Sequence, residues 1–342
     1  MKIGILGTGG IARVHIEALK KIPGAVVSAI AGRNYERTQK IAMEFGISSP
    51  YSSYEELIDE ADLEAVINCT PNFLHAPLSI RALDRGHHVL CEKPMSTTTA
   101  EAEAMVKSAH NAGKLLMPAM CFRFEERTMM AAEIINEGRL GDIYYIKADF
   151  LRRDGQPGGW FTDSKTAGGG ALLDIGVHIL DLSMFLSNCG RPVSVKGQVF
   201  YHPAMMDGII GTDKWVSVNQ DGNRDVETFG TGLVAFDNGI TINLEAGWNQ
   251  HREKDLLSLA IYGTKGGLQI YPELRLFRNK DSKMVSEELE NLIPEETENG
   301  RFKKQAQHFI QALKGETECT CPAEDGLKSV QIIENIYNSS IL

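Results

Sequence analysis

A lysine at the end of an apolar strand is the first candidate for a catalytic residue. It lies in Glu92-Lys93-Pro94, directly after the strand-like stretch His88 to Cys91. Proline restricts the backbone of the residue before it, so Lys93 leaves the strand in a defined direction. This placement favours an active-site cation. An exposed lysine at a strand end is the alternative.

A carboxylate and an imidazole form the second candidate group. Asp174 and His178 are four residues apart in a predicted helix that follows the glycine run Gly168 to Gly170. Residues with this spacing lie on one face of a helix, so both side chains could reach one site. Their neighbours are apolar, and polar groups on such a helix need a polar cavity. A surface pair is the alternative.

The elements that position these groups begin with a strand, a glycine turn and a helix. Lys2 to Leu19 reads KIGILGTGGIARVHIEAL and contains a G-x-G-x-x-A turn. Such a turn bends tightly at its first glycine and lets a pyrophosphate approach at the second, where free helix N–H groups attract phosphate. A tight turn without a ligand is the alternative. We predict a dinucleotide site that includes Gly7, Thr8, Gly9, Gly10 and Ile11.

The end of the second predicted strand indicates which dinucleotide is bound. Ala31-Gly32-Arg33-Asn34 has no carboxylate at the place where an acidic residue commonly binds the adenosine ribose hydroxyls. Its absence removes repulsion against a 2′-phosphate, and Arg33 can pair with that group. We therefore favour NADP(H), with NAD(H) as the alternative. Asn34 and Arg37 are included in the predicted site, although Arg37 is equally compatible with solvated surface charge.

Two further turns predict cofactor contacts. Thr70-Pro71-Asn72 and His75 follow the strand Glu64 to Cys69, and Glu92-Lys93-Pro94 follows the next strand. Ligands of parallel sheets bind outside the carboxyl ends of the strands, so these turns are expected at the same rim as the glycine turn. For Asn72 and His75, a helix cap and a partly buried histidine are alternatives of equal weight.

The order of the predicted elements divides the chain in two. Strand and helix patterns alternate over residues 1–121, as in a parallel sheet of βαβ units, and we predict a Rossmann domain there. Strand-like runs separated by short turns dominate residues 122–342, which predicts an α+β domain with an open, mostly antiparallel sheet. The acidic stretch Lys280 to Gly300 is expected to be a surface connection.

Composition restricts the class of protein. The 342 residues are 43% hydrophobic and 23% charged, as in ordinary globular proteins. A net charge of −10 would repel a phosphate backbone, so we expect no nucleic-acid partner. No apolar run reaches the roughly 18 residues that span a bilayer. The six cysteines lack metal-ligand spacing, Cys319 and Cys321 being the only close pair. We expect free thiols, no membrane association, no metal and a cytoplasmic location.

The glycine turn, Glu92-Lys93-Pro94 and the Asp174-x-Gly-x-His178 helix, in this order, resemble the Gfo/Idh/MocA family of sugar and polyol oxidoreductases. The resemblance covers nearly the whole chain. It implies that Lys93, Asp174 and His178 are catalytic and that Arg123 lies near cofactor and substrate. It also implies a homodimer or homotetramer formed through the free face of the second sheet. Gly32-Arg33 departs from the acidic residue of many members, which affects the choice of nucleotide and not the fold.

The resemblance implies an NAD(P)-dependent dehydrogenase or reductase of a secondary alcohol or ketone in a sugar, polyol or cyclitol. Trp160 and Phe161 could cover an apolar sugar face or pack in the core, and Arg152, Arg153 and Lys165 are candidate contacts for an acidic substituent or solvated charges. Two alternatives stay open. Some relatives use the cofactor transiently and act as glycosidases, and others are non-enzymatic dinucleotide sensors that regulate transcription.

Overall fold

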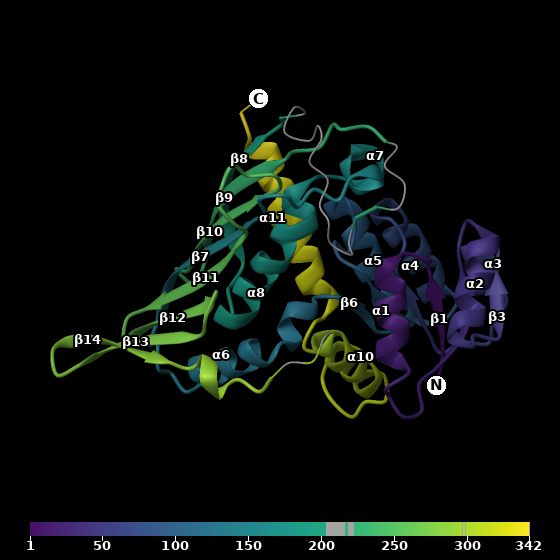
Figure 1. The fold of residues 1–342 in the computed structure, drawn as a ribbon, viewed down its shortest axis with the longest axis horizontal. Coiled ribbons are helices and arrows are strands. Elements are labelled where there is room, and N and C mark those ends of the chain that lie inside the picture. The colour runs from purple at the N-terminus through teal and green to yellow at the C-terminus, as the bar shows by residue number, and fades with distance from the viewer. Residues whose placement is uncertain (203–215, 218–221, 296, 298, 342) are drawn as a thin grey trace. The chain divides into compact units, whose positions relative to one another are not determined.

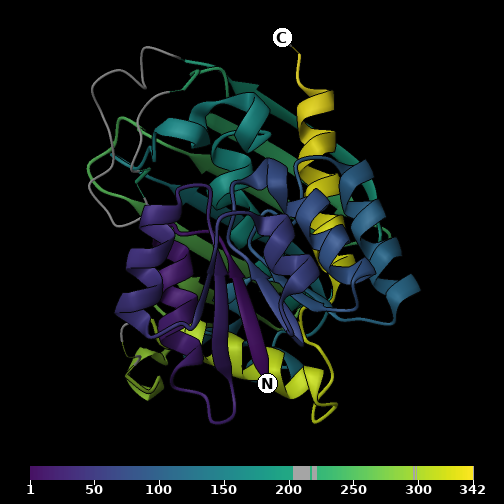
Figure 2. The same cartoon turned by 90° about the vertical axis from the view of Figure 1, so that its right-hand side faces the viewer.

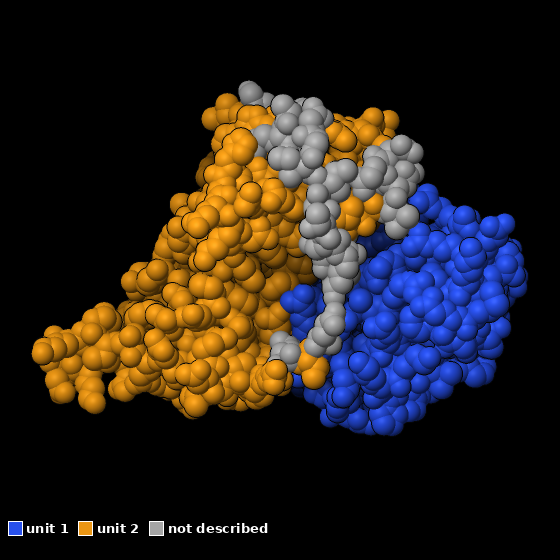
Figure 3. Space-filling model, viewed as in Figure 1, with its two compact units in different colours: residues 1–121, 298–330 blue, residues 122–297, 331–342 orange. Residues whose placement is uncertain are grey.

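The computed structural model describes residues 1–202, 216–217, 222–295, 297 and 299–341. The chain forms two compact units (Figures 1 and 3): residues 1–121 with 298–330, and residues 122–297 with 331–342. The sequence predicted that everything after residue 121 belongs to the second domain. Residues 300–330 differ because Phe302 packs edge-on against His15 at 6.1 Å, and the Cys321 thiol lies 3.2 Å from the Pro118 carbonyl oxygen.

The first unit contains a six-stranded parallel sheet in the order β3-β2-β1-β4-β5-β6. Short runs of buried apolar residues form its central strands, because helices cover both faces of the sheet (Figure 2). The strands are β1 (Lys2–Leu6), β2 (Val26–Ala31), β3 (Ser49–Tyr51), β4 (Ala65–Asn68), β5 (His88–Cys91) and β6 (Leu116–Pro118). The predicted Rossmann arrangement is confirmed, with β3 as a strand that the sequence pattern did not indicate.

Helices connect these strands, and side chains cap several of them. Asn34, Ser53 and Thr98 accept hydrogen bonds from backbone N–H groups at the starts of α2, α3 and α5. The helices of this unit are α1 (Gly10–Leu19), α2 (Tyr35–Phe45), α3 (Tyr54–Glu60), η1 (Asn72–Leu74), α4 (His75–Asp84), α5 (Thr99–Ala112), α10 (Gly300–Leu313) and the first part of α11 (Ala323–Ser339).

The second unit contains an eight-stranded sheet in the order β14-β13-β12-β11-β7-β10-β9-β8. Neighbouring strands are antiparallel except for β7 and β10, and the Asn238-Gly239 turn joins β9 to β10. The strands are β7 (Ile143–Leu151), β8 (Pro192–Phe200), β9 (Phe229–Phe236), β10 (Thr241–Gly247), β11 (Leu256–Gly263), β12 (Gly266–Tyr271), β13 (Arg275–Lys280) and β14 (Lys283–Glu288). The open, mostly antiparallel sheet is thus confirmed.

The expectation of a surface connection over residues 280–300 is wrong for its first part. Residues 283–288 form β14, which pairs with β13 in an antiparallel hairpin and places Met284 on the exposed side. Arg275 lies 3.5 Å from Glu288 across the hairpin, and the Arg278 guanidinium contacts the Glu287 carboxylate. The acidic composition therefore reflects the solvated edge of a sheet.

One face of this sheet is covered by helices. They are α6 (Glu126–Asn136), η4 (Leu172–Gly176) and α8 (Val177–Ser187), with η3 (Gly159–Thr162), α7 (Ser164–Ala167) and η5 (Glu290–Leu292) in the connections. Residues 164–187 are long and apolar enough to cross a membrane by composition, but 83% of their most apolar window is buried in the fold. This burial identifies the stretch as a core element of the unit.

Candidate active site

The glycine turn follows β1 and opens α1. Gly7 has φ +114°, and a Cβ there would lie 2.5 Å from the Cys69 carbonyl oxygen, so glycine is required. A Cβ at Gly9 would meet no atom within 4 Å. No side chain caps α1, and no acidic residue lies in its first turn. The free N–H groups and the open space beside Gly9 fit a dinucleotide pyrophosphate.

The end of β2 leaves no room for an acidic side chain at position 32. A Cβ on Gly32 would lie 2.6 Å from Thr8 Cγ2 and 2.7 Å from Thr38 Oγ1. Arg33 is exposed beside the buried Tyr54 hydroxyl; burial raises the pKa of Tyr54, and the positive charge of Arg33 opposes that rise. A positive charge thus occupies the place where many dinucleotide sites carry a carboxylate.

Asn34, a predicted cofactor residue, caps the next helix. Its Oδ1 accepts a hydrogen bond from the Arg37 backbone N–H at 2.9 Å and so caps α2. A short polar side chain before a helix commonly serves in this way. Arg37 is half-exposed on the first turn of the same helix.

A buried asparagine at the end of β4 organises the next turn. Asn68 Oδ1 accepts from Thr70 Oγ1 at 2.7 Å, and Asn68 Nδ2 donates to the His75 carbonyl oxygen and to Ser79 Oγ, both at 3.1 Å. These bonds hold the Thr70-Pro71-Asn72 turn against α4. Sequence reasoning missed Asn68, although a polar residue within an apolar strand could have indicated such a role.

Two buried histidines brace the turn that carries Lys93. His15 Nε2 lies 2.7 Å from Glu92 Oε1, and the Lys93 N–H donates to Glu92 Oε2 at 3.2 Å. Burial opposes ionisation of Glu92, but its interactions with His15 and with the charge and backbone N–H of Lys93 together outweigh burial, so the pKa of Glu92 is lowered. On the other side, His75 Nδ1 lies 2.7 Å from the Pro94 carbonyl oxygen. The backbone of Lys93 is therefore held from both flanks.

His75 acts through this backbone, which agrees with the alternative of a buried histidine and not with a direct cofactor contact. It is only 1% exposed, and its second ring nitrogen lies 2.8 Å from the Thr70 carbonyl oxygen. Burial lowers the pKa of His75, which favours a neutral ring that donates to one carbonyl oxygen at a time. His75 thereby joins the turns after β4 and β5.

Within the first unit, the predicted cofactor residues meet at one rim. Leu6 pairs with Ala31 and with Asn68, and Asn68 pairs with Cys91, so four strands end at the same level. The segments that follow these strands are the glycine turn, Arg33, Thr70-Pro71-Asn72 and Glu92-Lys93-Pro94.

In the second unit, Asp174 and His178 are the partly exposed polar residues of an otherwise buried helix. Every residue from 171 to 184 is buried except these two, which are half-exposed. Residues 172–176 form a π-helical turn rather than the expected α-helix. The wider turn still places the two side chains about one turn apart, on the same side of the helix.

Neighbouring aromatic groups orient both side chains. The indole N–H of the fully buried Trp248 donates to Asp174 Oδ2 at 3.1 Å, and the His178 ring packs on Phe122 with centroids 4.9 Å apart. Trp248 follows β10, far from Asp174 in the sequence, and sequence reasoning did not include it. A carboxylate held by an indole, with an imidazole beside it, can bind a hydroxyl group and exchange its proton.

Arg123 lies in the interior of the second unit. Its Nε and Nη2 donate to the two carboxylate oxygens of Asp181 at 2.8 and 2.5 Å, and the guanidinium stacks over Phe185 at 4.8 Å. Arg123 and Asp181 are 2% and 1% exposed. The resemblance implied a residue near the cofactor. In the structure, this fork-like pair links the turn before α6 to α8.

The predicted substrate contacts lie in the connection after β7. Trp160 and Phe161 stack on each other with centroids 3.8 Å apart, and the Arg152 guanidinium lies 5.4 Å from the Phe150 ring centre. Trp160 and Arg152 are half-exposed, while Arg153 and Lys165 are exposed on the same connection.

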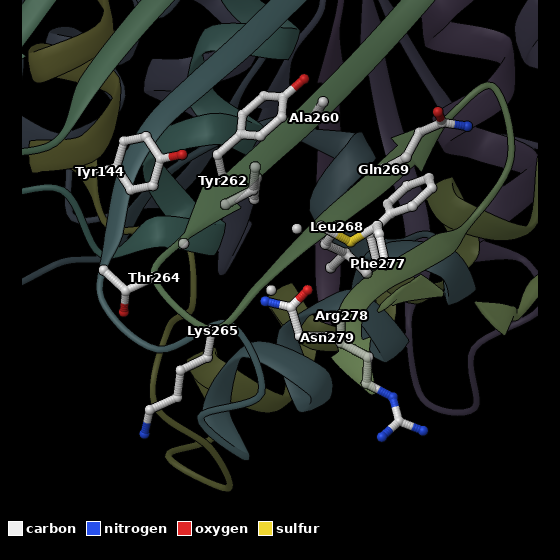
Figure 4. A pocket seen from close by; sticks show the side chains of 15 residues that line it. Tyr144, Ala260, Tyr262, Thr264, Lys265, Leu268, Gln269, Phe277, Arg278 and Asn279 are labelled. Carbon is white, nitrogen blue, oxygen red and sulfur yellow. The ribbon is translucent and has the colours of Figure 1, made fainter. Parts of the chain in front are cut away.

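A groove of about 480 Å³ lies elsewhere on the second unit, on the strands β11 to β13 (Figure 4). Tyr144, Tyr262 and Phe277 contribute rings to it, and Lys265 and Arg278 contribute positive charges. Asp174 and His178 do not line this groove. It is therefore a separate surface feature.

Comparison with known proteins identifies the family. Residues 1–120 match a model described as "Oxidoreductase family, NAD-binding Rossmann fold", and residues 128–269 match the GFO/IDH/MocA C-terminal domain. The chain belongs to the Gfo/Idh/MocA oxidoreductase family. The predicted family and the class of NAD(P)-dependent dehydrogenase are thereby confirmed.

Individual relatives extend over the whole chain. D-glucoside 3-dehydrogenase of Escherichia coli is 29% identical over 99% of this chain and 95% of its own length. D-xylose 1-dehydrogenase (NADP(+)) 2 of Haloferax volcanii is 26% identical over 99% and 97%. The structure of levoglucosan dehydrogenase in complex with NADH and levoglucosan matches with a TM-score of 0.85 at 24% identity, covering 99% of this chain and 97% of that one. This likeness supports the fold.

The Arg123–Asp181 pair predicts a stability effect without an effect on nucleotide binding. Asp181→Asn removes the buried negative charge that compensates Arg123. We expect the free energy of unfolding, measured by urea denaturation, to fall by about 3–5 kcal/mol. The folded variant should bind NADPH with a Kd within about twofold of wild type, measured by nicotinamide fluorescence. A large rise in Kd with unchanged stability would instead place Arg123 at the cofactor. Asp163→Asn, a change on the half-exposed connection, is the control.

Proposed function

We propose that the protein transfers hydride between a nicotinamide nucleotide and a secondary alcohol or ketone of a sugar, polyol or cyclitol. The observation that carries the proposal is the exposure of Asp174 and His178 alone on the buried helix 171–184. Lys93, whose backbone is held on both sides, provides a cation. The glycine turn, with space beside Gly9, provides a nucleotide site. Sugar dehydrogenases among the relatives support the substrate class.

Each residue has a defined task in this mechanism. The residues that would hold the cofactor are those of the glycine turn and the rim, and the nicotinamide supplies hydride acceptance and donation when bound. His178 takes the proton of the substrate hydroxyl in oxidation and returns it in reduction. Lys93 donates a hydrogen bond to the same oxygen and stabilises its developing negative charge. Asp174, oriented by Trp248, positions the substrate or the imidazole.

We further propose NADP(H) as the preferred nucleotide. Gly32 cannot carry a carboxylate without displacing Thr8 or Thr38, and the exposed Arg33 adjoins it. A relative named for NADP(+) and a neighbour in complex with NADH show that both nucleotides occur among similar proteins.

We also propose that the chain forms a homodimer or homotetramer through the outer face of the eight-stranded sheet. Helices cover the inner face, whereas Tyr144, Leu233 and Tyr262 are 53%, 51% and 42% exposed on the outer side. Large apolar side chains grouped on one surface favour association. A second copy fits this face because the resemblance implies self-association there.

Removal of the Lys93 ammonium should separate chemistry from binding. We expect Lys93→Met to lower kcat by at least about 100-fold, because the developing alkoxide loses its charged donor, while Kd for NADPH changes less than about twofold. The measurement is the absorbance of reduced nicotinamide with a panel of sugars, inositols and oxidised sugars. Lys107→Met, on an exposed face of α5, is the matched control. Turnover retained by Lys93→Met contradicts the assigned role.

The same assay separates the alternative reactions. Net reduction of added NADP⁺ indicates a dehydrogenase, whereas release of a glycosidic substituent without net reduction indicates transient redox use. If the nucleotide binds but neither NADP⁺ reduction nor release of a substituent is observed, the protein is a sensor.

Arg33 should determine the choice of nucleotide. We expect Arg33→Ser to raise Kd for NADPH by about tenfold or more and to leave Kd for NADH nearly unchanged, because the lost charge pairs only with the 2′-phosphate. Isothermal titration with both nucleotides measures this. Arg85→Ser, on an exposed turn after α4, is the control. Equal losses for the two nucleotides would refute the assignment.

The sheet face predicts the oligomeric state. We expect Tyr262→Glu to convert the oligomer to monomer in sedimentation velocity, since it would bury a charge at the contact. Met43→Glu, at a 75% exposed apolar position of the first unit, should leave the mass unchanged. A monomeric wild-type protein, or an unaffected Tyr262→Glu variant, contradicts the proposed face.

A further inference from the structure

Two side chains from distant parts of the chain occupy the space beside the glycine run. Gly168 caps the end of α7 with φ +79°. A Cβ on Gly169 would lie 2.2 Å from the Tyr337 hydroxyl, and a Cβ on Gly170 would lie 1.9 Å from the Glu227 carbonyl oxygen. The second and third glycines are therefore required by the close approach of Tyr337 and Glu227, and not only by a turn.

The Glu227 carboxylate holds the start of the helix that carries Asp174. Its Oε2 accepts from the Gly170 N–H at 2.7 Å, and its Oε1 accepts from the Leu172 N–H and the Tyr337 hydroxyl, both at 2.9 Å. The Ala171 N–H also donates to the Glu227 carbonyl oxygen at 3.3 Å. These bonds secure three consecutive N–H groups, and Asp174 follows two residues after the last of them.

We propose that Glu227 is a positioning residue whose ionised carboxylate fixes the helix start before Asp174 and His178 and whose protonation releases it. An ionised carboxylate only accepts hydrogen bonds, and the N–H groups of Gly170 and Leu172 and the Tyr337 hydroxyl all donate to it. Protonation converts one of these oxygens into an O–H donor, which weakens the hydrogen bond that it accepts from the N–H of Gly170 or Leu172. The catalytic consequence rests on the function proposed above, but the structural change does not.

The surroundings place this change in the neutral pH range. Burial raises the pKa of Glu227 to about 7, against the hydrogen bonds from Leu172, Gly170 and Tyr337, which favour the charged form. Among the residues that the structure describes, the titratable groups that act on the same cluster are two phenols, Tyr337 and Tyr201, and the Asp225 carboxylate. Burial and the charge of Glu227 raise the pKa of Tyr337 well above its usual value. Burial, Glu227 and Asp225 raise the pKa of Tyr201. Both phenols therefore keep their protons while Glu227 titrates.

The sign of the effect follows from this shift. Above about pH 7 the carboxylate is charged and the helix start is held, and below that pH protonation weakens one of these hydrogen bonds. Because the folded pKa lies above the unfolded value, the folded protein binds the extra proton between about pH 4.5 and pH 7. Protonation of Glu227 therefore does not destabilise the folded state relative to the unfolded state. The loosening at acid pH is confined to the helix start.

Trp248 provides a reporter that needs neither substrate nor cofactor. Its indole N–H donates to Asp174 Oδ2, so its resonance follows the position of that carboxylate. We expect the ¹⁵N–¹H indole signal of Trp248, assigned through Trp248→Phe in the full-length protein, to shift between pH 5.5 and 8.5 with a midpoint near 7. The other two tryptophan indoles serve as internal references.

Variants of the cluster distinguish Glu227 from other titrating groups. Glu227→Gln should abolish the transition, and Tyr337→Phe should raise its midpoint by roughly one pH unit, because a donor that favours the charged form is lost. His178→Asn should keep the transition, which excludes the imidazole as its source. Glu334→Gln, a half-exposed position on α11, should also keep it.

The possible results decide the proposal whether or not sugar oxidation is observed. A transition that disappears in Glu227→Gln and moves upward in Tyr337→Phe supports it. If Glu227→Gln does not fold, the shift in Tyr337→Phe decides. A flat wild-type signal, an unmoved midpoint in Tyr337→Phe, or loss of the transition in His178→Asn overturns it.

Discussion

An ionised carboxylate in a protein interior must be compensated by donors that surround it, and this constraint positions the reactive groups of the chain. Glu92 meets His15 at 2.7 Å, Asp181 meets both arms of Arg123, and Glu227 meets two backbone N–H groups and a phenol. A buried charge that loses its partners is costly, so each contact defines one geometry for the segments that it joins.

The segments joined in this way are those that carry the chemistry. Glu92 precedes Lys93, and its bond to α1 ties the lysine turn to the helix whose N-terminus faces the glycine turn. Asp181 lies one turn beyond His178 on the same buried helix. The reactive side chains are half-exposed, whereas the groups that hold them are buried. Buried ion pairs and hydrogen bonds thus fix the positions of the reactive side chains, and these side chains themselves stay accessible to a substrate.

Local patterns in the sequence predict the elements and the reactive residues, because both depend on neighbours in the chain. Apolar runs predicted β1, β4 and β5, and the spacing of Asp174 and His178 predicted a shared helix face. The holding partners lie 77 residues apart for His15 and Glu92, and 74 for Trp248 and Asp174. No periodicity links such positions, so the pairing could not be predicted. His75 illustrates the reverse case, since a polar residue near a site can serve the backbone.

The glycine run before Asp174 shows why composition alone misleads at such a place. Three consecutive glycines indicate a loop with wide conformational freedom, yet Gly169 and Gly170 are restricted by atoms of Tyr337 and Glu227. Their small size admits a buried carboxylate to the N–H groups of the helix start. A larger residue at position 170 would displace Glu227 and leave those N–H groups buried without their acceptor, and one at position 169 would displace the Tyr337 hydroxyl that donates to it. The glycines and the remote glutamate therefore form one structural unit, and neither is explained without the other.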